Sequence, residues 1–450
     1  MKFHILTFGC QMNVNDSDWL ARALTVQGHE AAAEDQAEVF ILNTCSVRDK
    51  PEQKVYSELG RLRGYLDANP AIFAAVAGCV AQQIGQKLCE KFPFVRLVLG
   101  PDGLRHAPAA LEELAEHPDR RLVLTEFLDR FEEREQAWPE LAEPEAAPRT
   151  AFVNIMQGCD NFCTYCIVPF VRGRQKSRPP KAILSECQAL LERGVREITL
   201  LGQNVNSFGS DASGMGVSFA QLLHQVAALS ELDRLRFTTS HPKDIAPEVI
   251  RAFGELENLA PHLHLPLQSG SDRILARMGR KYDRARYLAI VDGLRQARPD
   301  IVLGTDLIVG FPGETEEDFD QTLAMVERVG FESSYSFKYS DRPGTAAERM
   351  PEKVDSQVAQ GRLLRLQDLQ NTITRNSLKN CVGREAVVLY EGLSRVQVGA
   401  GVFWQGRDPS FRIVNVEHPK GLKLAGKLQT VRVTQAKKHS LMGEGIGRPW

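Results

Sequence analysis

Three cysteines in the middle of the chain have the spacing of ligands to one metal centre. Cys159, Cys163 and Cys166 form a Cys-x3-Cys-x2-Cys run directly after a strand-like segment. Three thiolates this close in sequence can bind three irons of a [4Fe–4S] cluster, which leaves the fourth iron open. An open position is typical of catalytic rather than structural metal sites.

Zinc and plain burial are the competing interpretations of this run. A structural zinc ion needs a fourth ligand, and the nearest unassigned candidate, Cys187, falls inside a predicted helix. Residues 167–186 contain no histidine. The spacing therefore favours an iron–sulfur cluster over zinc, and over three thiols that only pack in a core.

A second set of cysteines recurs near the beginning of the chain. Cys10, Cys45 and Cys79 lie 35 and 34 positions apart, and each follows a strand-like run. Carboxyl ends of parallel strands meet at one edge of a sheet, so a second three-cysteine cluster is predicted there. Buried free cysteine is the alternative, and it is the interpretation we adopt for the remaining cysteines, Cys89, Cys187 and Cys381.

The elements that must position these cysteines fall into three units. Strand-like runs alternate with helix-compatible stretches over 1–131, which predicts βαβ units and a parallel sheet. Six glutamates and three prolines mark a linker at 132–148. A second βα series over 149–375 predicts a complete or partial (β/α) barrel with its site residues at the carboxyl ends of the strands. Its candidate strands are 151–157, 197–201, 235–239, 262–267, 302–309 and 333–339, with helices at 183–193 and 358–378.

Residues 376–442 predict a small all-β barrel, with short runs at 385–390, 395–398, 411–416 and 429–434 between glycines. From Arg375 to Trp450 there are 13 Lys and Arg against 5 Asp and Glu, although the whole chain carries a net charge of -2. A basic appendage on an acidic body indicates a polyanionic partner, typically nucleic acid.

The overall composition, 43% hydrophobic and 25% charged, is that of a globular protein. No apolar run approaches the length of a membrane span, and the first residues lack the pattern of a signal peptide. We therefore expect a cytoplasmic protein without membrane attachment, and most simply a monomer.

Five motifs carry a resemblance to a known family, namely Phe8–Asn13, Asn43–Arg48, Gly78–Gln82, Phe162–Pro169 and Tyr339–Ala346. With them the chain resembles the radical S-adenosylmethionine (SAM) methylthiotransferases over nearly its whole length. The resemblance implies an N-terminal methylthiotransferase domain, a radical SAM core and a C-terminal TRAM domain that binds RNA. The context Ser46-Val47-Arg48 is more similar to the tRNA-modifying branch than to the branch that acts on a ribosomal protein. The segment Gly406–Phe411 departs from the family's pattern, which bears on the details of RNA contact.

The resemblance implies methylthiolation of C2 of N6-(dimethylallyl)adenosine at position 37 of tRNA. The C2–H bond has no useful acidity, so cofactors must supply the chemistry. The implied cofactors are two [4Fe–4S] clusters and two SAM molecules per turnover. The cluster on Cys159, Cys163 and Cys166 would cleave SAM to a hydrogen-abstracting radical, and the cluster on Cys10, Cys45 and Cys79 would deliver sulfur. The implied partners are a tRNA anticodon stem-loop, a flavodoxin- or ferredoxin-like electron donor and a sulfur source.

Candidate SAM contacts follow the ends of the predicted barrel strands. They are Gly202, Gln203, Asn204, Ser240, Gln268, Asp306 and Gly310. Glycine turns there let a ligand approach the backbone, and Thr315 with Asp318 is predicted to cap the helix after Gly310. Each has a structural alternative, such as an ordinary turn or a helix cap.

Three basic stretches remain. We expect phosphate contacts from the group Arg172, Arg174, Lys176 and Arg178 and from the group Lys420, Lys423, Lys427, Arg432, Lys437 and Lys438, with salt-dependent binding. The group Arg273, Arg277, Arg280, Lys281, Arg284 and Arg286 is interpreted as a solvated helix face. Phe403 and Trp404 are more typical of a barrel core than of base stacking.

Alternatives stay open within and outside the family. Within the family, the alternative is that this protein methylthiolates threonylcarbamoyladenosine in tRNA or a ribosomal-protein aspartate. A non-catalytic iron–sulfur protein that binds RNA or senses redox state is the alternative of another class, and the open iron argues against it.

Overall fold

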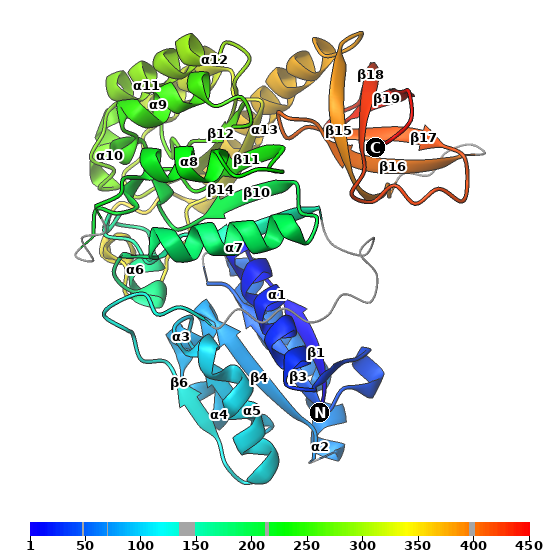
Figure 1. Ribbon diagram of the computed structural model, residues 1–450. Coiled ribbons are helices and arrows are strands. Elements are labelled where there is room, and N and C mark those ends of the chain that lie inside the picture. The colour runs from blue at the N-terminus through cyan, green and yellow to red at the C-terminus, as the bar shows by residue number, and fades with distance from the viewer. Residues whose placement is uncertain (47–48, 70, 135–148, 212–215, 396–400) are drawn as a thin grey trace.

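The computed structural model describes residues 1–46, 49–69, 71–134, 149–211, 216–395 and 401–450. Figure 1 shows an N-terminal sheet unit, a central βα unit and a C-terminal β-barrel, which the long helix α13 (Ser356–Lys379) joins to the centre. Most of the predicted linker, 135–148, lies outside the described residues.

The N-terminal unit is a six-stranded parallel sheet in the order β2-β1-β3-β4-β5-β6. Its strands are β1 (Lys2–Thr7), β2 (Glu30–Ala31), β3 (Val39–Thr44), β4 (Phe73–Gly78), β5 (Val95–Leu99) and β6 (Leu122–Leu124). Strands β3, β4 and β5 are buried on both faces, which explains their largely apolar sequences. The predicted parallel sheet is confirmed.

Helices cover both faces of this sheet. The helices α1 (Gln11–Val26) and α5 (Ala107–Glu116) pack on one face, where Trp19, Leu20 and Leu111 meet Phe3 and Ile41. The helices α2 (Asp49–Ala68), α3 (Cys79–Ile84) and α4 (Lys87–Lys91) cover the other face. The strand order reverses between β1 and β3, and such a switch point opens a crevice at the carboxyl ends of the two strands.

The central unit is an open half-barrel of two three-stranded parallel sheets, β11-β10-β7 and β12-β13-β14. Its strands are β7 (Thr150–Asn154), β10 (Glu197–Leu201), β11 (Arg234–Phe237), β12 (His262–His264), β13 (Val302–Val309) and β14 (Ser333–Lys338). A bridge between Leu235 and Leu259 joins the sheets. Within the described part of the chain β14 does not pair with β7, so the barrel is partial.

The predicted strand at 151–157 is interrupted. Only residues 150–154 belong to β7, and Met156–Gln157 form β8, which pairs antiparallel with β9 (Lys176–Ser177). The ladder closes the loop that carries Cys159, Cys163 and Cys166. Gly158 begins the loop at φ +80°, where an added Cβ would lie 2.0 Å from the Arg174 carbonyl oxygen, so the position requires glycine.

Helices surround the half-barrel. They are α6 (Val168–Arg172), α7 (Pro180–Glu192), α8 (Phe219–Ala227), α9 (Pro247–Glu255), α10 (Asp272–Arg277), α11 (Arg284–Ala297) and α12 (Glu316–Val329). The helices predicted at 183–193 and 358–378 are confirmed as α7 and α13, and Gly194 at φ +92° follows the end of α7. Cys187 is buried in the core that α7 shares with the strands.

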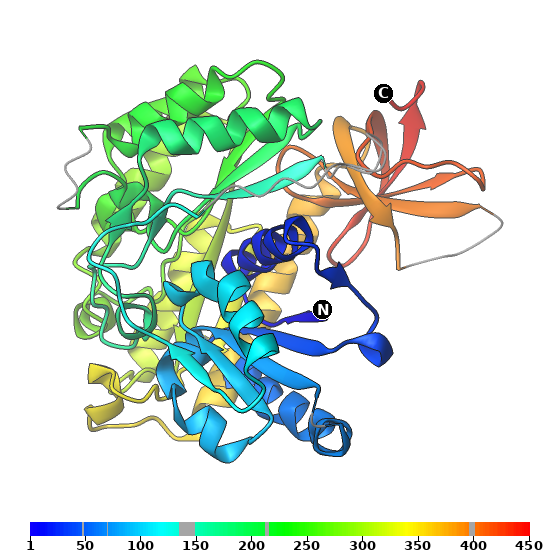
Figure 2. The same ribbon diagram turned by 60° about the horizontal axis from the view of Figure 1, so that its bottom comes forward.

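The C-terminal unit is a closed barrel in the order β15-β16-β17-β19-β18. Its strands are β15 (Glu385–Leu393), β16 (Val402–Arg407), β17 (Ile413–His418), β18 (Leu428–Ala436) and β19 (Leu441–Ile446). Sequence patterns miss β16 and β19 because both contain glycine, and most of the strand predicted at 395–398 lies outside the described residues. Trp404 is buried in the barrel core, and Phe403 is buried as well. Figure 2 shows the barrel beside the half-barrel.

The segment that departs from the family pattern docks this barrel onto the central unit. The Arg236 guanidinium donates to the carbonyl oxygens of Asp408 (3.2 Å) and Pro409 (2.9 Å). The Phe411 ring stacks on the His262 ring at 5.2 Å, and Arg412 pairs with Glu332 at 2.9 Å. These residues hold two units together. In the part of the chain that the structure describes, no helix has the length and apolar character to cross a membrane.

Two candidate three-cysteine sites

The first three cysteines converge at the switch point of the N-terminal sheet. Cys10 precedes α1, Cys45 follows β3, and Cys79 begins α3 after β4. Cys10 is exposed as a residue, whereas Cys45 and Cys79 are buried. The Cys10 thiol interacts with both the Cys45 and the Cys79 thiol, so the three cysteines converge as the strand ends predict.

Glycines and asparagines fix this rim. An added Cβ at Gly9, which has φ +136°, would lie 2.4 Å from the Cys45 Cβ, and one at Gly78, φ +89°, would lie 2.4 Å from the Thr44 carbonyl oxygen. The Asn13 amide donates to the Thr44 carbonyl oxygen and to Asn43 Oδ1, both at 2.9 Å. Positions 9 and 78, next to the cysteines, therefore require glycine.

The three thiols of this site sit in different electrostatic surroundings. A hydrogen bond with Cys45 lowers the pKa of the Cys10 thiol to about 6, against the opposing effect of burial. Burial raises the pKa of the Cys79 thiol, and the Arg172 guanidinium beside it acts in the opposite direction. A second cation, Arg342 in the loop after β14, lies near Cys45, and burial lowers the pKa of its guanidinium.

The second three cysteines lie in the loop closed by β8 and β9. Burial raises the pKa of Cys166 to about 12, and the nearby Cys163 and Cys159 thiols add to that rise. Cys163 Sγ lies 3.4 Å from Arg280 Nη1 and 3.9 Å from His241 Nε2. The loop therefore brings its three thiols together beside a cation.

Arg280 corrects an expectation from the sequence. We expected a solvated helix face, but α10 ends at Arg277 and Gly279 turns the chain inward at φ +70°. Arg280 is buried, and all three of its guanidinium nitrogens have partners, which are Cys163, Tyr165, Tyr282 and the Pro266 carbonyl oxygen. Gly279, shortly after the end of α10, is the sequence feature that could have predicted this turn.

Each cysteine set offers three thiols, the number of protein ligands that a [4Fe–4S] cluster with one open iron requires. Among the described residues, no three His, Cys, Asp or Glu side chains are grouped to hold one metal ion. A cluster needs a different geometry, because each thiolate binds a different iron. The zinc interpretation of the Cys159 run therefore gains no support.

Unsatisfied polar atoms also mark both sites. At the first, Ser46 Oγ and Arg172 Nη1 are buried without a hydrogen-bond partner among the described residues, and at the second the same holds for Asn204 Oδ1 and Ser240 Oγ. Buried polar atoms in native proteins are nearly always paired, so these atoms fit sites that bind a polar group.

Four of the candidate SAM residues lie around the second cysteine loop. Gln203 Oε1 accepts a hydrogen bond from the Gly158 backbone N–H at 2.6 Å. The Asn204 amide donates to Asp244 at 2.7 Å, and Ser240 follows β11. Close packing alone also requires glycine at position 202, because an added Cβ would lie 2.5 Å from Met156 Cγ.

Gln268 and Asp306 lie together on the other half of the barrel. The Gln268 backbone N–H donates to the Asp306 carbonyl oxygen at 2.8 Å, and Gln268 adopts φ +70°. The Asp306 carboxylate lies 3.2 Å from His264 Nε2. Non-glycine residues with positive φ are uncommon and cluster at functional sites.

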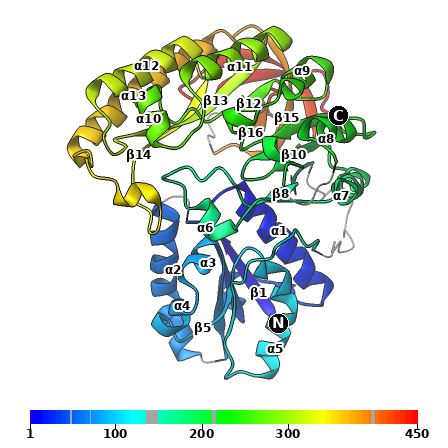
Figure 3. The same ribbon diagram turned by 90° about the vertical axis from the view of Figure 1, so that its left-hand side faces the viewer.

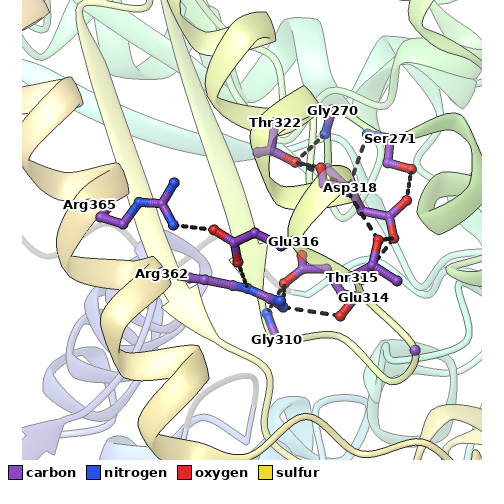
Figure 4. A network of polar contacts seen from close by, with 12 residues as sticks. Gly270, Ser271, Gly310, Glu314, Thr315, Glu316, Asp318, Thr322, Arg362 and Arg365 are labelled. Carbon is purple, nitrogen blue, oxygen red and sulfur yellow. Dashed lines mark hydrogen bonds and ion pairs between the residues drawn. The ribbon is translucent and has the colours of Figure 1, made fainter.

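Gly310 takes part in a network of polar contacts with Glu314 and Arg362 (Figure 4). Its N–H donates to Glu314 Oε2 at 2.6 Å, and Glu314 in turn accepts from Arg362 of α13 at 2.8 Å. At φ +71°, an added Cβ would lie 2.6 Å from the Ala359 Cβ. Thr315 and Asp318 form the predicted capping box of α12. Gly310 therefore has a structural role.

The first basic stretch is also corrected. We expected phosphate contacts, but three of its four side chains are buried in ion pairs. Arg172 pairs with Asp16, and Lys176 pairs with Asp102. Arg178 pairs with both Glu133 and Glu186. Arg174 alone is exposed, and it pairs with Asp160 at 2.9 Å. In the last basic stretch all six side chains are exposed.

Comparisons with known proteins agree with this geometry. Residues 153–326 match the Radical SAM superfamily, and residues 2–100 match a family described as "Uncharacterized protein family UPF0004". The chain is similar in fold to the radical S-adenosylmethionine methyltransferase TsrM from Kitasatospora setae, with a TM-score of 0.54 and 14% identity over 77% of this chain and 76% of that one. The half-barrel with its three-cysteine loop is thus that of a radical SAM enzyme, a class that uses a [4Fe–4S] cluster and SAM.

Two curated relatives narrow the class. The chain is 61% identical over 448 residues to the tRNA-2-methylthio-N(6)-dimethylallyladenosine synthase of Nitratidesulfovibrio vulgaris (strain Hildenborough), covering 100% of this chain and 99% of the relative. It is 54% identical to the protein of the same name from Oleidesulfovibrio alaskensis, and the match covers 99% of this chain and 98% of the relative. The chain belongs to the family of the tRNA-2-methylthio-N(6)-dimethylallyladenosine synthases.

Proposed function

We propose that this protein methylthiolates C2 of N6-(dimethylallyl)adenosine at position 37 of tRNA. The observation that carries the proposal is the convergence of six cysteines into two sites within a chain that matches such synthases over its full length. The anticodon stem-loop is the proposed substrate, with an electron donor and a sulfur source as further partners. The proposed units are 1–131 for the sulfur-delivering domain, 149–375 for the radical SAM core and 376–442 for RNA binding.

Each cysteine set has a proposed task. Cys159, Cys163 and Cys166 hold the cluster at which SAM binds, and Cys10, Cys45 and Cys79 hold the cluster that donates sulfur. When bound, these clusters and two SAM molecules per turnover supply the radical, the sulfur and the methyl group.

The chain's own residues bind and orient these groups. The buried Ser240 hydroxyl and Asn204 carbonyl oxygen offer unused hydrogen-bonding capacity to SAM. Gln203 holds the start of the cysteine loop through Gly158, and Arg280 holds Cys163 from the opposite side of the barrel. The loop is thereby fixed relative to the strand ends.

Anaerobic turnover with an anticodon stem-loop that carries dimethylallyladenosine tests the proposal. The reconstituted protein, with SAM and dithionite, should form the 2-methylthio nucleoside and 5′-deoxyadenosine. Cys159→Ala should abolish both products, whereas Cys45→Ala should block sulfur insertion and keep some 5′-deoxyadenosine formation. Cys381→Ala, at a buried thiol that packs against the core of the C-terminal barrel, should retain both activities.

Equal loss of both products in Cys45→Ala would contradict the division of labour. Release of 5′-deoxyadenosine without a modified stem-loop would instead reject the dimethylallyl substrate and favour the threonylcarbamoyl or ribosomal alternative. No 5′-deoxyadenosine from protein with intact clusters would reject the enzyme.

A further inference from the structure

One short helix connects the two cysteine sites. The helix α6 begins two residues after Cys166, and its last residue is Arg172. It packs against α3, which begins at Cys79, and Cys79, Ile167 and Val171 form a buried apolar cluster between them. Figure 3 shows α6 and α3 adjacent at the junction of the N-terminal and central units. Arg172 thus belongs to one unit and reaches the cysteine site of the other.

The Arg172 side chain is buried and only partly satisfied. It is 3% exposed, and its Nη2 lies 3.5 Å from Asp16 Oδ2. Its Nη1 is buried without a hydrogen-bond partner among the described residues. At the other site, by contrast, every nitrogen of Arg280 has a partner in the protein. The guanidinium is hydrogen-bonded to the Cys79 thiol, and its unused Nη1 donor can bind a further acceptor at the same cysteine site.

The charges around Arg172 lead to the same conclusion. Asp16, 1% exposed, is shared with Arg134, whose Nη1 lies 2.8 Å from Asp16 Oδ1. Two guanidinium groups therefore face one carboxylate, and Arg342 approaches the same site near Cys45. A buried charge needs a counter-charge, and the three cysteines at this point become anionic when they bind metal.

We propose that Arg172 is a positioning residue of the Cys10, Cys45 and Cys79 site, where its free guanidinium donor binds anionic sulfur and stabilises the reduced and the sulfur-loaded states. Net charge and hydrogen bonds to sulfur set the potential of an iron–sulfur site. A cation delivered by α6 also makes the sulfur-holding state depend on correct docking of the two units. This inference rests on the proposed function in one respect, that these three cysteines hold a cluster.

The experiment uses the full-length chain with Cys159, Cys163 and Cys166 replaced by alanine, so that only the N-terminal site binds a cluster. In this background we compare Arg172, Arg172→Lys and Arg172→Met. The readouts are the midpoint of an EPR-monitored redox titration and the affinity for added hydrosulfide. Arg172→Met should shift the reduction equilibrium about tenfold toward the oxidised form, or about 59 mV for one electron, and weaken hydrosulfide binding about tenfold. The redox midpoint and the hydrosulfide affinity of Arg172→Lys should lie between those of the Arg172 protein and Arg172→Met, because lysine keeps the positive charge but lacks the planar guanidinium.

Two controls separate this role from a purely structural one. Asp16→Asn breaks the ion pair but keeps the cation, so it should not lower the potential or the hydrosulfide affinity. Arg174→Met removes a charge two residues away, on an exposed side chain, and should leave both values unchanged. If Arg172→Met does not fold, Arg172→Lys alone must still shift both readouts.

The outcomes distinguish the inference from the proposed function. A cluster with unchanged potential and hydrosulfide affinity in the Arg172 variants would overturn the inference and leave the proposed function standing. Failure of the background protein to assemble any cluster would reject the assignment of Cys10, Cys45 and Cys79, and the inference with it.

Discussion

At the residue scale, the Ser240 hydroxyl is the side chain that we propose to bind SAM. It is buried at the end of β11 without a hydrogen-bond partner among the described residues. Ser240→Ala should therefore weaken SAM binding about fivefold, the effect of losing roughly 1 kcal/mol of hydrogen bonding, and should not reduce stability. Equilibrium dialysis with SAM and thermal unfolding of the SAM-free protein measure the two quantities.

Gly310→Ala is the matched control, because it should reduce stability without changing SAM affinity. Its positive φ and its contact with Ala359 predict a loss of stability of at least about 1 kcal/mol. Its SAM affinity should be unchanged, since its N–H is already bonded to Glu314. A Ser240→Ala protein with normal affinity, or a Gly310→Ala protein with weakened affinity, would contradict these assignments.

At the same scale, the sequence predicts the convergence of the cysteines but not the partners of the arginines. Cysteines at strand ends must meet because parallel strands share an edge. Arg172 and Arg174 have the same charge and lie two positions apart, yet one is buried and the other exposed. Burial of a single side chain depends on how the units dock, and no local pattern in the sequence encodes that docking.

At the scale of elements, Asp102 joins the N-terminal unit to the β8–β9 ladder. Its carboxylate accepts from Lys176 Nζ at 2.6 Å, Gln157 Nε2 at 2.7 Å and the Leu128 N–H at 3.0 Å. Asp102→Asn leaves the buried Lys176 ammonium unpaired and should cost about 3 kcal/mol of unfolding free energy in urea. Adding Lys176→Met should recover part of that loss, and a double variant less stable than Asp102→Asn would contradict the pairing.

The contact between His262 and Phe411 makes docking of the C-terminal barrel sensitive to acid. Burial, with Arg236 nearby, lowers the pKa of His262 to about 3. Its folded pKa thus lies below its unfolded value, so the unfolded chain takes up the proton first and stability is lost as the pH falls from about 6.5 toward 3. At pH 5 the loss approaches about 2 kcal/mol.

His262→Phe keeps an aromatic ring against Phe411 and removes this titration. Its unfolding midpoint should therefore fall less between pH 7 and pH 5 than that of the unmodified protein. Equal losses in the two proteins would show that His262 does not carry the acid sensitivity.

Sequence patterns locate most elements of the fold and misplace those that depend on long-range contact. The strands β10 and β13 lie at the predicted residues because both are largely buried and rich in Ile, Leu and Val. The run 151–157 divides into β7 and β8 because residues 156–157 pair with β9, about twenty positions later. Partners that distant leave no trace in local periodicity.

At the scale of the whole molecule, the exposed lysines of the C-terminal barrel predict salt-dependent binding of tRNA. Replacing Lys437 and Lys438 with glutamine should reduce the slope of log affinity against log salt by about 1 to 2, because two phosphate contacts are lost. Filter binding across a series of salt concentrations measures the slope. Replacing the exposed Lys87 and Lys181 with glutamine removes the same charge outside the barrel and should leave the slope unchanged. An equal decrease of the slope in the two double variants would show that the barrel lysines have no specific role in tRNA binding.

The central claim concerns the reaction and its substrate, and mass spectrometry of tRNA nucleosides from cells with and without this gene tests it most directly. Loss of 2-methylthio-N6-(dimethylallyl)adenosine, with accumulation of N6-(dimethylallyl)adenosine, is the predicted result. An unchanged level of the 2-methylthio nucleoside in cells that lack the gene would contradict it.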